Sequence, residues 1–213
     1  MRKGRFLTLF ICVVSLVAIF LVSVKMGDDL KNDPVKRENS VVFESNPSVS
    51  HLAKEVKIDL KKITVSKELE EYLEKSKVKW EDKDEEDVVE TLLYIENKFG
   101  YQPLLFLKLM KVESNFKLNA VSPDGAIGLC QIQPQTAKEI SLKMGSPQIP
   151  RSVLFDPVIN LKLSAYYLNY LETKYKSLPK ALNVYNMGPK KYFEVYGESS
   201  FLQGSYHKKI SDN

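Results

Sequence analysis

Cysteine and histidine are scarce in this sequence, with two of each among 213 residues. Cys12 lies inside an apolar run and Cys130 lies far along the chain, so we expect no intrachain disulfide bond. His51 and His207 are also far apart, which makes a zinc site improbable. No glycine-rich loop of the kind that cradles phosphate groups is present. We therefore expect neither a metal ion nor another cofactor.

Strand-like alternation of polar and apolar residues is absent over any useful length, and the sequence contains no internal repeat. The fold class expected from this pattern is all-α. The formal net charge of +4 is mild and gives no strong case for a nucleic-acid partner. From Tyr101 onward, 14 basic side chains stand against 8 acidic ones, a balance that suits an anionic polymer.

The one long apolar run covers residues 6–24 and follows Arg2, Lys3 and Arg5. At about 1.5 Å per residue such a helix nearly spans a bilayer core of roughly 30 Å. The basic flank predicts a cytoplasmic N-terminus, with the rest of the chain on the outer side of the inner membrane. Leu21 to Lys25 make a poor cleavage site, so an uncleaved anchor is favoured over a signal peptide.

We expect three regions: the anchor or signal segment at residues 1–25, a charged tether with a short helix at 26–85, and a compact domain at 86–213. The short helix should begin at Ser66 and run through Lys79, with Trp80 pinning it to the domain. The acidic run 81–87 reads as a solvated linker.

Helices of the compact domain are predicted from their start and stop signals. A capping-box pattern at Asp87 to Glu90 opens the first helix, and Gly100 ends it. The later helices are expected at 103–113, 134–144, 157–176 behind Asp156, 179–186 and from Pro189, and the tail 206–210 is expected to fold back on the core.

Glu113 closes the most apolar of these helices. Desolvation and the negative end of the helix dipole should both raise the pKa of its carboxyl group. A carboxyl group that stays protonated near neutral pH can act as a general acid. The alternative is structural, because Lys117 stands one turn further on and can form an ion pair with Glu113.

Three sequence motifs then occur in order: ES at 113–114, SPDGAIGLCQI at 122–132 and ALNVYNMGP at 181–189. Together with Asp156, Pro157 and Asn160 between the last two, they resemble the bacterial soluble lytic transglycosylase domain of the lysozyme-like superfamily. The resemblance covers residues 86–210, approximately. Cys130 and Gln133 depart from it, since methionine is common in the family at both places, and this puts substrate preference in doubt more than the reaction.

The resemblance implies cleavage of the β-1,4 bond between N-acetylmuramic acid and N-acetylglucosamine in peptidoglycan, with a 1,6-anhydro product. Glu113 would protonate the bridging oxygen and then act as base on the C6 hydroxyl group. A nucleophile supplied by the substrate explains why the motifs hold one catalytic acid, whereas ordinary glycosidases use two. The residues that the resemblance assigns to substrate binding are Ser114, Ser122, Gly128, Gln131, Gln133, Tyr185 and Asn186.

Some of these residues also have structural interpretations. Gly125 and Gly128 either let the backbone approach a sugar or only turn the chain. Tyr185 either holds the protonated Glu113 or packs in the core, and Asn186 either reads the substrate or caps its helix. Ser114 either orients Glu113 or simply ends the helix.

Two other functions remain open from the sequence. One is a hydrolase of the goose-type lysozyme kind, a muramidase that also uses a single Glu. The other is a wall-binding module of an envelope-spanning machine, in which case an envelope protein complex is the partner. A replaced Glu113 would be the cue for the second function, and Glu113 is present.

Overall fold

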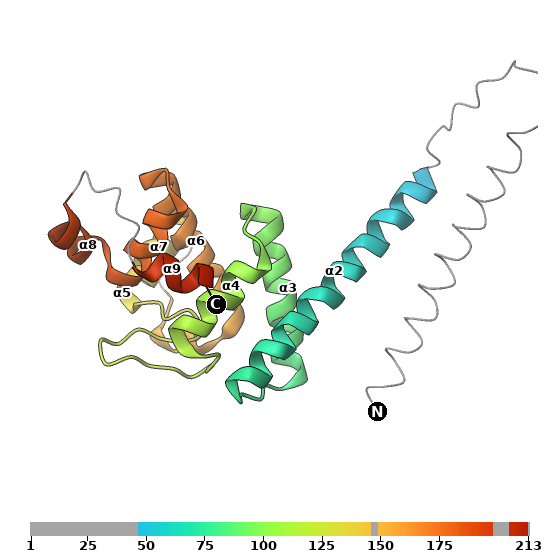
Figure 1. The fold of residues 1–213 in the computed structure, drawn as a ribbon, viewed down its shortest axis with the longest axis horizontal. Helices are drawn as coiled ribbons and strands as arrows, with labels where there is room; N and C mark the ends of the chain where they lie inside the picture. The colour runs from blue at the N-terminus through green and yellow to red at the C-terminus, as the bar shows by residue number, and fades with distance from the viewer. Residues whose placement is uncertain (1–46, 146–148, 198–204, 213) are drawn as a thin grey trace, which may run out of the picture. The chain divides into compact units, whose positions relative to one another are not determined.

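The computed structural model describes residues 47–145, 149–197 and 205–212. These residues form α-helices joined by loops and one short 3₁₀ helix (Figure 1). The described part contains no β-strand and only two isolated bridges, which pair Ile127 with Val121 and with Ile132. The all-α prediction is therefore confirmed for this part of the chain.

The helices, in chain order, are α2 (Pro47–Ser76), α3 (Asp82–Phe99), α4 (Pro103–Ser114), α5 (Pro134–Lys143), the 3₁₀ helix η2 (Arg151–Phe155), α6 (Pro157–Tyr175), α7 (Leu178–Met187), α8 (Pro189–Tyr196) and α9 (Ser205–Asp212). The described helices include none that is both long and apolar enough to cross a membrane. The predicted anchor at residues 6–24 lies outside the described residues.

Most of the predicted helix ends are confirmed. Gly100 ends α3 with φ 77°, a left-handed conformation that glycine adopts without steric cost. Asp156 caps α6, because its carboxylate accepts a hydrogen bond of 2.9 Å from the Ile159 backbone. Prolines stand in the first turn of α4 and α5, where the missing N–H group costs nothing.

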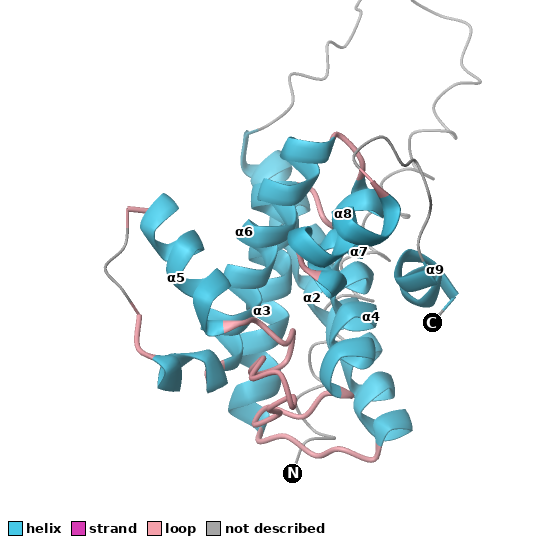
Figure 2. Ribbon diagram, turned by 90° about the vertical axis from the view of Figure 1, so that its left-hand side faces the viewer, coloured by secondary structure: helices cyan, strands magenta, loops and turns pink. Residues whose placement is uncertain are grey.

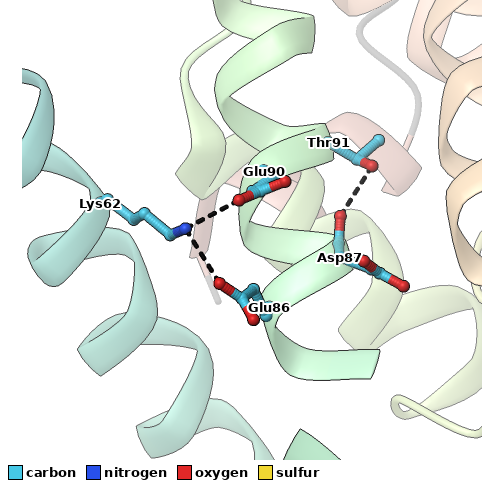
Figure 3. Close-up of polar contacts among 5 residues, drawn as sticks. All are labelled: Lys62, Glu86, Asp87, Glu90 and Thr91. Atoms are coloured by element: carbon cyan, nitrogen blue, oxygen red, sulfur yellow. Dashed lines mark hydrogen bonds and ion pairs between the residues drawn. The ribbon is translucent and has the colours of Figure 1, made fainter. Parts of the chain in front are cut away.

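Helix α2 starts at Pro47, so the prediction of a helix beginning at Ser66 within a charged tether is wrong. Ion pairs with α3 hold the middle of this helix. Lys62 bridges Glu86 at 3.2 Å and Glu90 at 2.8 Å, as Figure 3 shows, and Lys61 pairs with Glu96. The partners of these lysines lie 24 to 35 residues further along the chain, so the periodicity of one segment does not reveal the ion pairs.

The start of α3 is also a correction. The helix begins at Asp82, so Asp87 lies inside it and is not an N-cap. Its first turn holds Asp82, Asp84 and Glu85, where negative charge interacts favourably with the positive end of the helix dipole. The acidic run predicted as a solvated linker is therefore helical from residue 82 onward.

The C-terminal half of α2 contributes to the same hydrophobic core as the later helices. Val65, Leu69 and Leu73 are buried and belong to one core cluster with residues from α3, α4, α6 and α7. The Trp80 indole donates a hydrogen bond of 2.9 Å to the Phe116 carbonyl oxygen and packs on the Phe116 ring. The predicted pinning role of Trp80 is confirmed.

Helix α6 occupies the middle of the fold, in contact with α3, α5 and α7. The tail returns to the core as predicted: α9 contacts α4 and α7, and its Tyr206 and Ile210 are buried. The long connection between α4 and α5 has no helix of its own and runs along one end of the bundle (Figure 2). This connection and the ends of α4, α7 and α9 surround the candidate site.

Candidate active site

Glu113 lies in the last turn of α4, a helix whose other side chains are largely buried. Asn115 and Phe116 end the helix, both with positive φ, and Phe116 is fully buried. The chain turns away there and leaves the Glu113 carboxyl group facing α7 and α9.

Two polar side chains hold this carboxyl group. The Tyr206 hydroxyl of α9 donates a hydrogen bond to Oε1 of Glu113. The side chain of Asn186, at the end of α7, also forms a hydrogen bond with Glu113. The acid is thus positioned by three helices that lie far apart in the sequence.

Burial raises the pKa of Glu113 above its ordinary value of 4.5. The hydrogen bonds from Tyr206 and Asn186 favour the carboxylate and act in the opposite direction, but desolvation is the larger effect. The ion pair with Lys117 is absent from the described part of the chain, where Lys117 is exposed. The sequence-based expectation of a raised pKa is therefore confirmed, and the structural alternative of an ion pair is wrong.

Tyr185 is buried beside the site but does not bond to Glu113. Its hydroxyl donates a hydrogen bond of 2.9 Å to the Cys130 carbonyl oxygen, and its ring packs against Tyr167. Burial raises the pKa of Tyr185, and the neighbouring Cys130 and Glu113 add to the effect, so the phenol stays neutral. The geometry matches the core-packing interpretation, with Tyr185 tying α7 to the 122–132 loop.

Gly128 allows a close approach, but the approaching group belongs to the protein. Its φ is 79°, and a Cβ atom at this position would lie 2.4 Å from both Nδ2 of Asn160 and the Leu154 carbonyl oxygen. This close packing is by itself enough to require glycine here, and the contact of Gly128 with a sugar stays a prediction. Gly125 has φ 83° and open space around it, so it acts as a turn residue.

Asn160, from the first turns of α6, is fully buried and organises the loop around Gly128. Its Oδ1 accepts a hydrogen bond from the Cys130 backbone at 2.8 Å, and its Nδ2 donates to the Ile127 and Leu154 carbonyl oxygens at 2.9 Å. One amide side chain thereby satisfies three backbone groups that would otherwise be buried without partners.

The remaining predicted residues make contacts within their own segments. Ser114 donates to the Met110 carbonyl oxygen at 3.2 Å, which matches its interpretation as a helix-end residue. Ser122 accepts a hydrogen bond from the Ala126 backbone at 3.0 Å. Gln131 donates to the Gly128 carbonyl oxygen at 2.9 Å and Gln133 to that of Asp124 at 3.2 Å. These bonds shape the loop beside Glu113.

Two residues of the site were given no role from the sequence. Tyr206 was assigned only to a tail that folds back, and Asn160 only to a motif. The apolar spacing of Tyr206 and Ile210 showed that this helix would dock, but not that its hydroxyl would reach an acid 93 residues away.

The described residues hold no cluster of three or more His, Cys, Asp or Glu side chains suited to a metal ion. Cys130 is a free, buried cysteine, and burial raises the pKa of its thiol group. A buried neutral thiol is a poor nucleophile and a poor metal ligand. Chemistry at this site therefore centres on the carboxyl group of Glu113.

The described residues form a helical domain whose candidate site centres on the partly buried, protonatable carboxyl group of Glu113. Residues 90–207 match the family model of the transglycosylase SLT domain, which covers more than half of the chain. The chain belongs to this family.

Curated relatives include the membrane-bound lytic murein transglycosylases C of Photorhabdus laumondii and Yersinia enterocolitica. Each is 40% identical over 80 residues, an alignment that spans 37% of this chain and 22% of the relative. The chain thus matches about a fifth of the length of these relatives. Among solved structures, that of an inactive mutant of lytic transglycosylase Slt from Pseudomonas aeruginosa is similar, with 27% identity, a TM-score of 0.48, and coverage of 57% of this chain and 20% of the other.

Proposed function

We propose that this protein is a peptidoglycan lytic transglycosylase that cleaves the β-1,4 bond between N-acetylmuramic acid and N-acetylglucosamine. The observation that carries the proposal is the Glu113 carboxyl group, which is partly buried, has a raised pKa and is held by Tyr206 and Asn186 in a chain of the SLT family. The curated relatives are named as murein transglycosylases, which supports the same reaction here.

In the first step, the protonated Glu113 donates its proton to the bridging oxygen as the bond from that oxygen to C1 of the muramoyl sugar breaks. The electron pair of the bond leaves with the oxygen, which becomes the hydroxyl group of the departing N-acetylglucosamine. Glu113 is now a carboxylate, and the hydrogen bonds from Tyr206 and Asn186 stabilise this form.

In the second step, the Glu113 carboxylate removes the proton from the C6 hydroxyl group of the same sugar. The C6 oxygen bonds to C1 and closes the 1,6-anhydro ring, so that Glu113 ends protonated and no water is consumed. The environment suits both steps, because burial favours the acid form and the two hydrogen bonds favour the base form.

One carboxyl group is enough for this scheme. Ordinary glycosidases use two carboxyl groups placed on either side of the bond. Among the described residues, none of the groups that shift the pKa of Glu113 is another carboxylate. Asp156 is occupied as the cap of α6.

For substrate binding we propose the loop beside Glu113 together with the end of α7. Gln131 and Gln133 present amide groups to N-acetyl or hydroxyl groups of the sugars, and Asn186, which is exposed, contacts the sugar next to the cleaved bond. Ser114, Ser122, Gly128 and Tyr185 contribute by shaping the backbone and walls of the site.

We also propose that residues 1–25 anchor the protein in the inner membrane, that the chain between this anchor and α2 is the link, and that the catalytic domain, which includes the buried C-terminal half of α2, lies on the outer side. The apolar run 6–24 with its basic flank supports the anchor, and the curated relatives carry "membrane-bound" in their names.

Digestion of purified peptidoglycan sacculi with the full-length protein tests the reaction, with mass spectrometry of the released fragments. We expect fragments that end in 1,6-anhydro-N-acetylmuramic acid, and no such release by Glu113→Gln. Fragments with only reducing ends would show a hydrolase instead. Cleavage that survives Glu113→Gln would remove this residue from the mechanism.

A further inference from the structure

Lysine and tyrosine side chains gather along one face of α3 and α6. The Lys–Tyr strip, as we name this surface, consists of Tyr94 and Lys98 of α3 and of Lys162, Tyr166, Tyr170 and Lys174 of α6. The four α6 residues are spaced by four, so they follow one side of the helix. Asn160 and Ser164, which face the active-site loop, are two positions away from strip residues and therefore about 200° around the helix. The strip is thus separate from the site of Glu113.

The first half of the strip is held together by Lys98. Its ammonium group donates hydrogen bonds to the hydroxyl groups of Tyr94, at 2.9 Å, and of Tyr166. It also lies 4.6 Å from the centre of the Tyr166 ring, while Lys162 lies 5.3 Å from that of Tyr94. Tyr94 is 38% exposed, so this network is at the surface.

The second half is centred on Tyr170, which is 37% exposed. Two ammonium groups flank its ring, that of Lys143 from α5 at 4.8 Å and that of Lys174 at 5.9 Å from the ring centre. Lys162 and Lys174 are 12 residues apart in the sequence, so the strip extends over about 18 Å of helix.

The positive charge of the strip is not neutralised by acids. Lys98, Lys143, Lys162 and Lys174 form no ion pair with any acid of the described chain, and their contacts are to the rings and hydroxyl groups of neutral aromatic side chains. By contrast, three lysines of α2, Lys61, Lys62 and Lys75, pair with glutamates. Cation–π contacts at exposed sites are weak, about 0.5–1 kcal/mol each, so these ammonium groups can turn toward an anionic ligand.

We propose that the Lys–Tyr strip binds an anionic polysaccharide, a cell-wall glycan strand held on the face of α6 away from Glu113. Each α6 position of the strip has an ammonium group on it or beside its ring, and these positions follow one another at about 6 Å along the helix, which matches a linear polymer that carries carboxylate or phosphate groups. Tyrosine rings offer apolar faces to sugar C–H groups and hydroxyl groups for hydrogen bonds. The identification of the ligand as a wall glycan rests on the proposed function, whereas the prediction that the strip binds an anionic polymer does not.

Other anionic partners fit the strip less well. A membrane surface would call for Leu, Phe or Trp side chains that insert into the bilayer, and the strip contains none of them. Nucleic acid is most often bound through the planar, bidentate guanidinium group of arginine, and every basic residue of the strip is lysine.

The test measures co-sedimentation of the full-length Glu113→Gln protein with insoluble peptidoglycan sacculi, so that binding is separated from cleavage. One variant replaces Lys143, Lys162 and Lys174 with Gln, and a second carries Tyr170→Ala. The matched control replaces Lys54, Lys57 and Lys83 with Gln, which removes the same charge from exposed positions on α2 and α3 that form no ion pair with another described residue. Vesicles of phosphatidylglycerol are tested in parallel.

At low salt we expect the strip variant to bind sacculi about tenfold more weakly than the parent and Tyr170→Ala to bind about threefold more weakly. The control should bind like the parent. The reason is that exposed charges contribute little one by one but add up along a polymer.

An equal loss of binding in the control would mean that only net charge matters and would overturn the proposal. If Tyr170→Ala binds sacculi as strongly as the parent, the tyrosine ring does not contact the ligand and a glycan is excluded as the partner. If the strip variant loses binding to vesicles but not to sacculi, the partner is a membrane. If the full-length wild type fails to cleave sacculi while the strip variant loses binding, only the proposed activity fails.

Discussion

Glu113 experiences two opposing influences at the scale of a single residue. Desolvation favours its neutral form, and the hydrogen bonds from Tyr206 and Asn186 favour the carboxylate. A group that must first give and then take a proton gains from such a balance, because neither form is stabilised so strongly that the other becomes inaccessible. Tyr206 is the easiest part of this balance to change without altering the packing.

Tyr206→Phe removes the hydroxyl group and leaves the ring. Since the lost hydrogen bond lowers the pKa of Glu113, we expect that pKa to rise further. The general acid then stays protonated to higher pH, so the alkaline limb of the pH–rate profile moves upward while the maximal rate falls about tenfold or more. Rates of anhydro-fragment release between pH 4 and pH 9 measure this. A limb that stays in place or moves downward would contradict the assignment.

Gly128→Ala tests the close packing at the active-site loop. The new Cβ atom would lie 2.4 Å from the Leu154 carbonyl oxygen and from Asn160, in a backbone conformation with φ 79°. Strain and overpacking together should lower the free energy of unfolding by about 3 kcal/mol. Urea unfolding followed by circular dichroism gives the value.

Gly125→Ala is the matched control for this measurement. Its φ of 83° is similar, but nothing lies within 4 Å of the added Cβ atom. Only the backbone strain remains, and we expect a loss of about 1 kcal/mol. Equal losses at the two positions would mean that the contact with Asn160 contributes nothing.

At the scale of elements, α2 is the part that the sequence predicted least well. The first half of the helix carries exposed apolar residues such as Leu52, whereas its second half buries Leu69 and Leu73 in the core of the domain. The charged composition suggested a tether because a polar helix is recognised only through partners, here Glu86, Glu90 and Glu96 of α3.

Leu69→Ala should therefore destabilise the domain even though the residue lies before the match to the family model. The side chain is 1% exposed, and the loss of a buried leucine costs about 2–5 kcal/mol. Leu52→Ala, at a position 58% exposed, should change stability by no more than about 0.5 kcal/mol. Thermal unfolding of both variants makes the comparison. Similar melting temperatures would show that α2 is not part of the folding unit.

At the scale of the whole molecule, the buried acid links stability to pH. The pKa of Glu113 is raised in the folded state above its ordinary value of 4.5, so between these two pKa values the native protein binds more protons than the unfolded chain. Stability from this group is therefore fully present below pH 4.5 and is lost as pH rises through the folded pKa.

Glu113→Gln removes the ionisation and should change the pH dependence in a defined direction. The free energy of unfolding of Glu113→Gln, relative to that of the wild type, should be higher at pH 7.5 than at pH 4.5, because only the wild type has to bury a charge at the higher pH. Urea unfolding of the wild type and of Glu113→Gln at both pH values supplies the four free energies of unfolding. A difference with the reverse sign would show that the hydrogen bonds outweigh desolvation.

The sequence alone was enough to predict the helices from α4 to α8, apart from the 3₁₀ helix η2, and to single out Glu113 as the candidate acid. Prolines, Gly100 and the Asp156 cap act within one turn of the backbone, and the apolar run around Glu113 lies in a single helix, so these signals are local. The tertiary structure alone decided which groups touch that acid. Tyr206 stands 93 residues away, and Tyr185 turns from Glu113 to the Cys130 carbonyl oxygen. The packing of α9 and α7 against α4 sets these contacts, because hydrogen-bond partners depend on positions in space that no short stretch of the chain encodes.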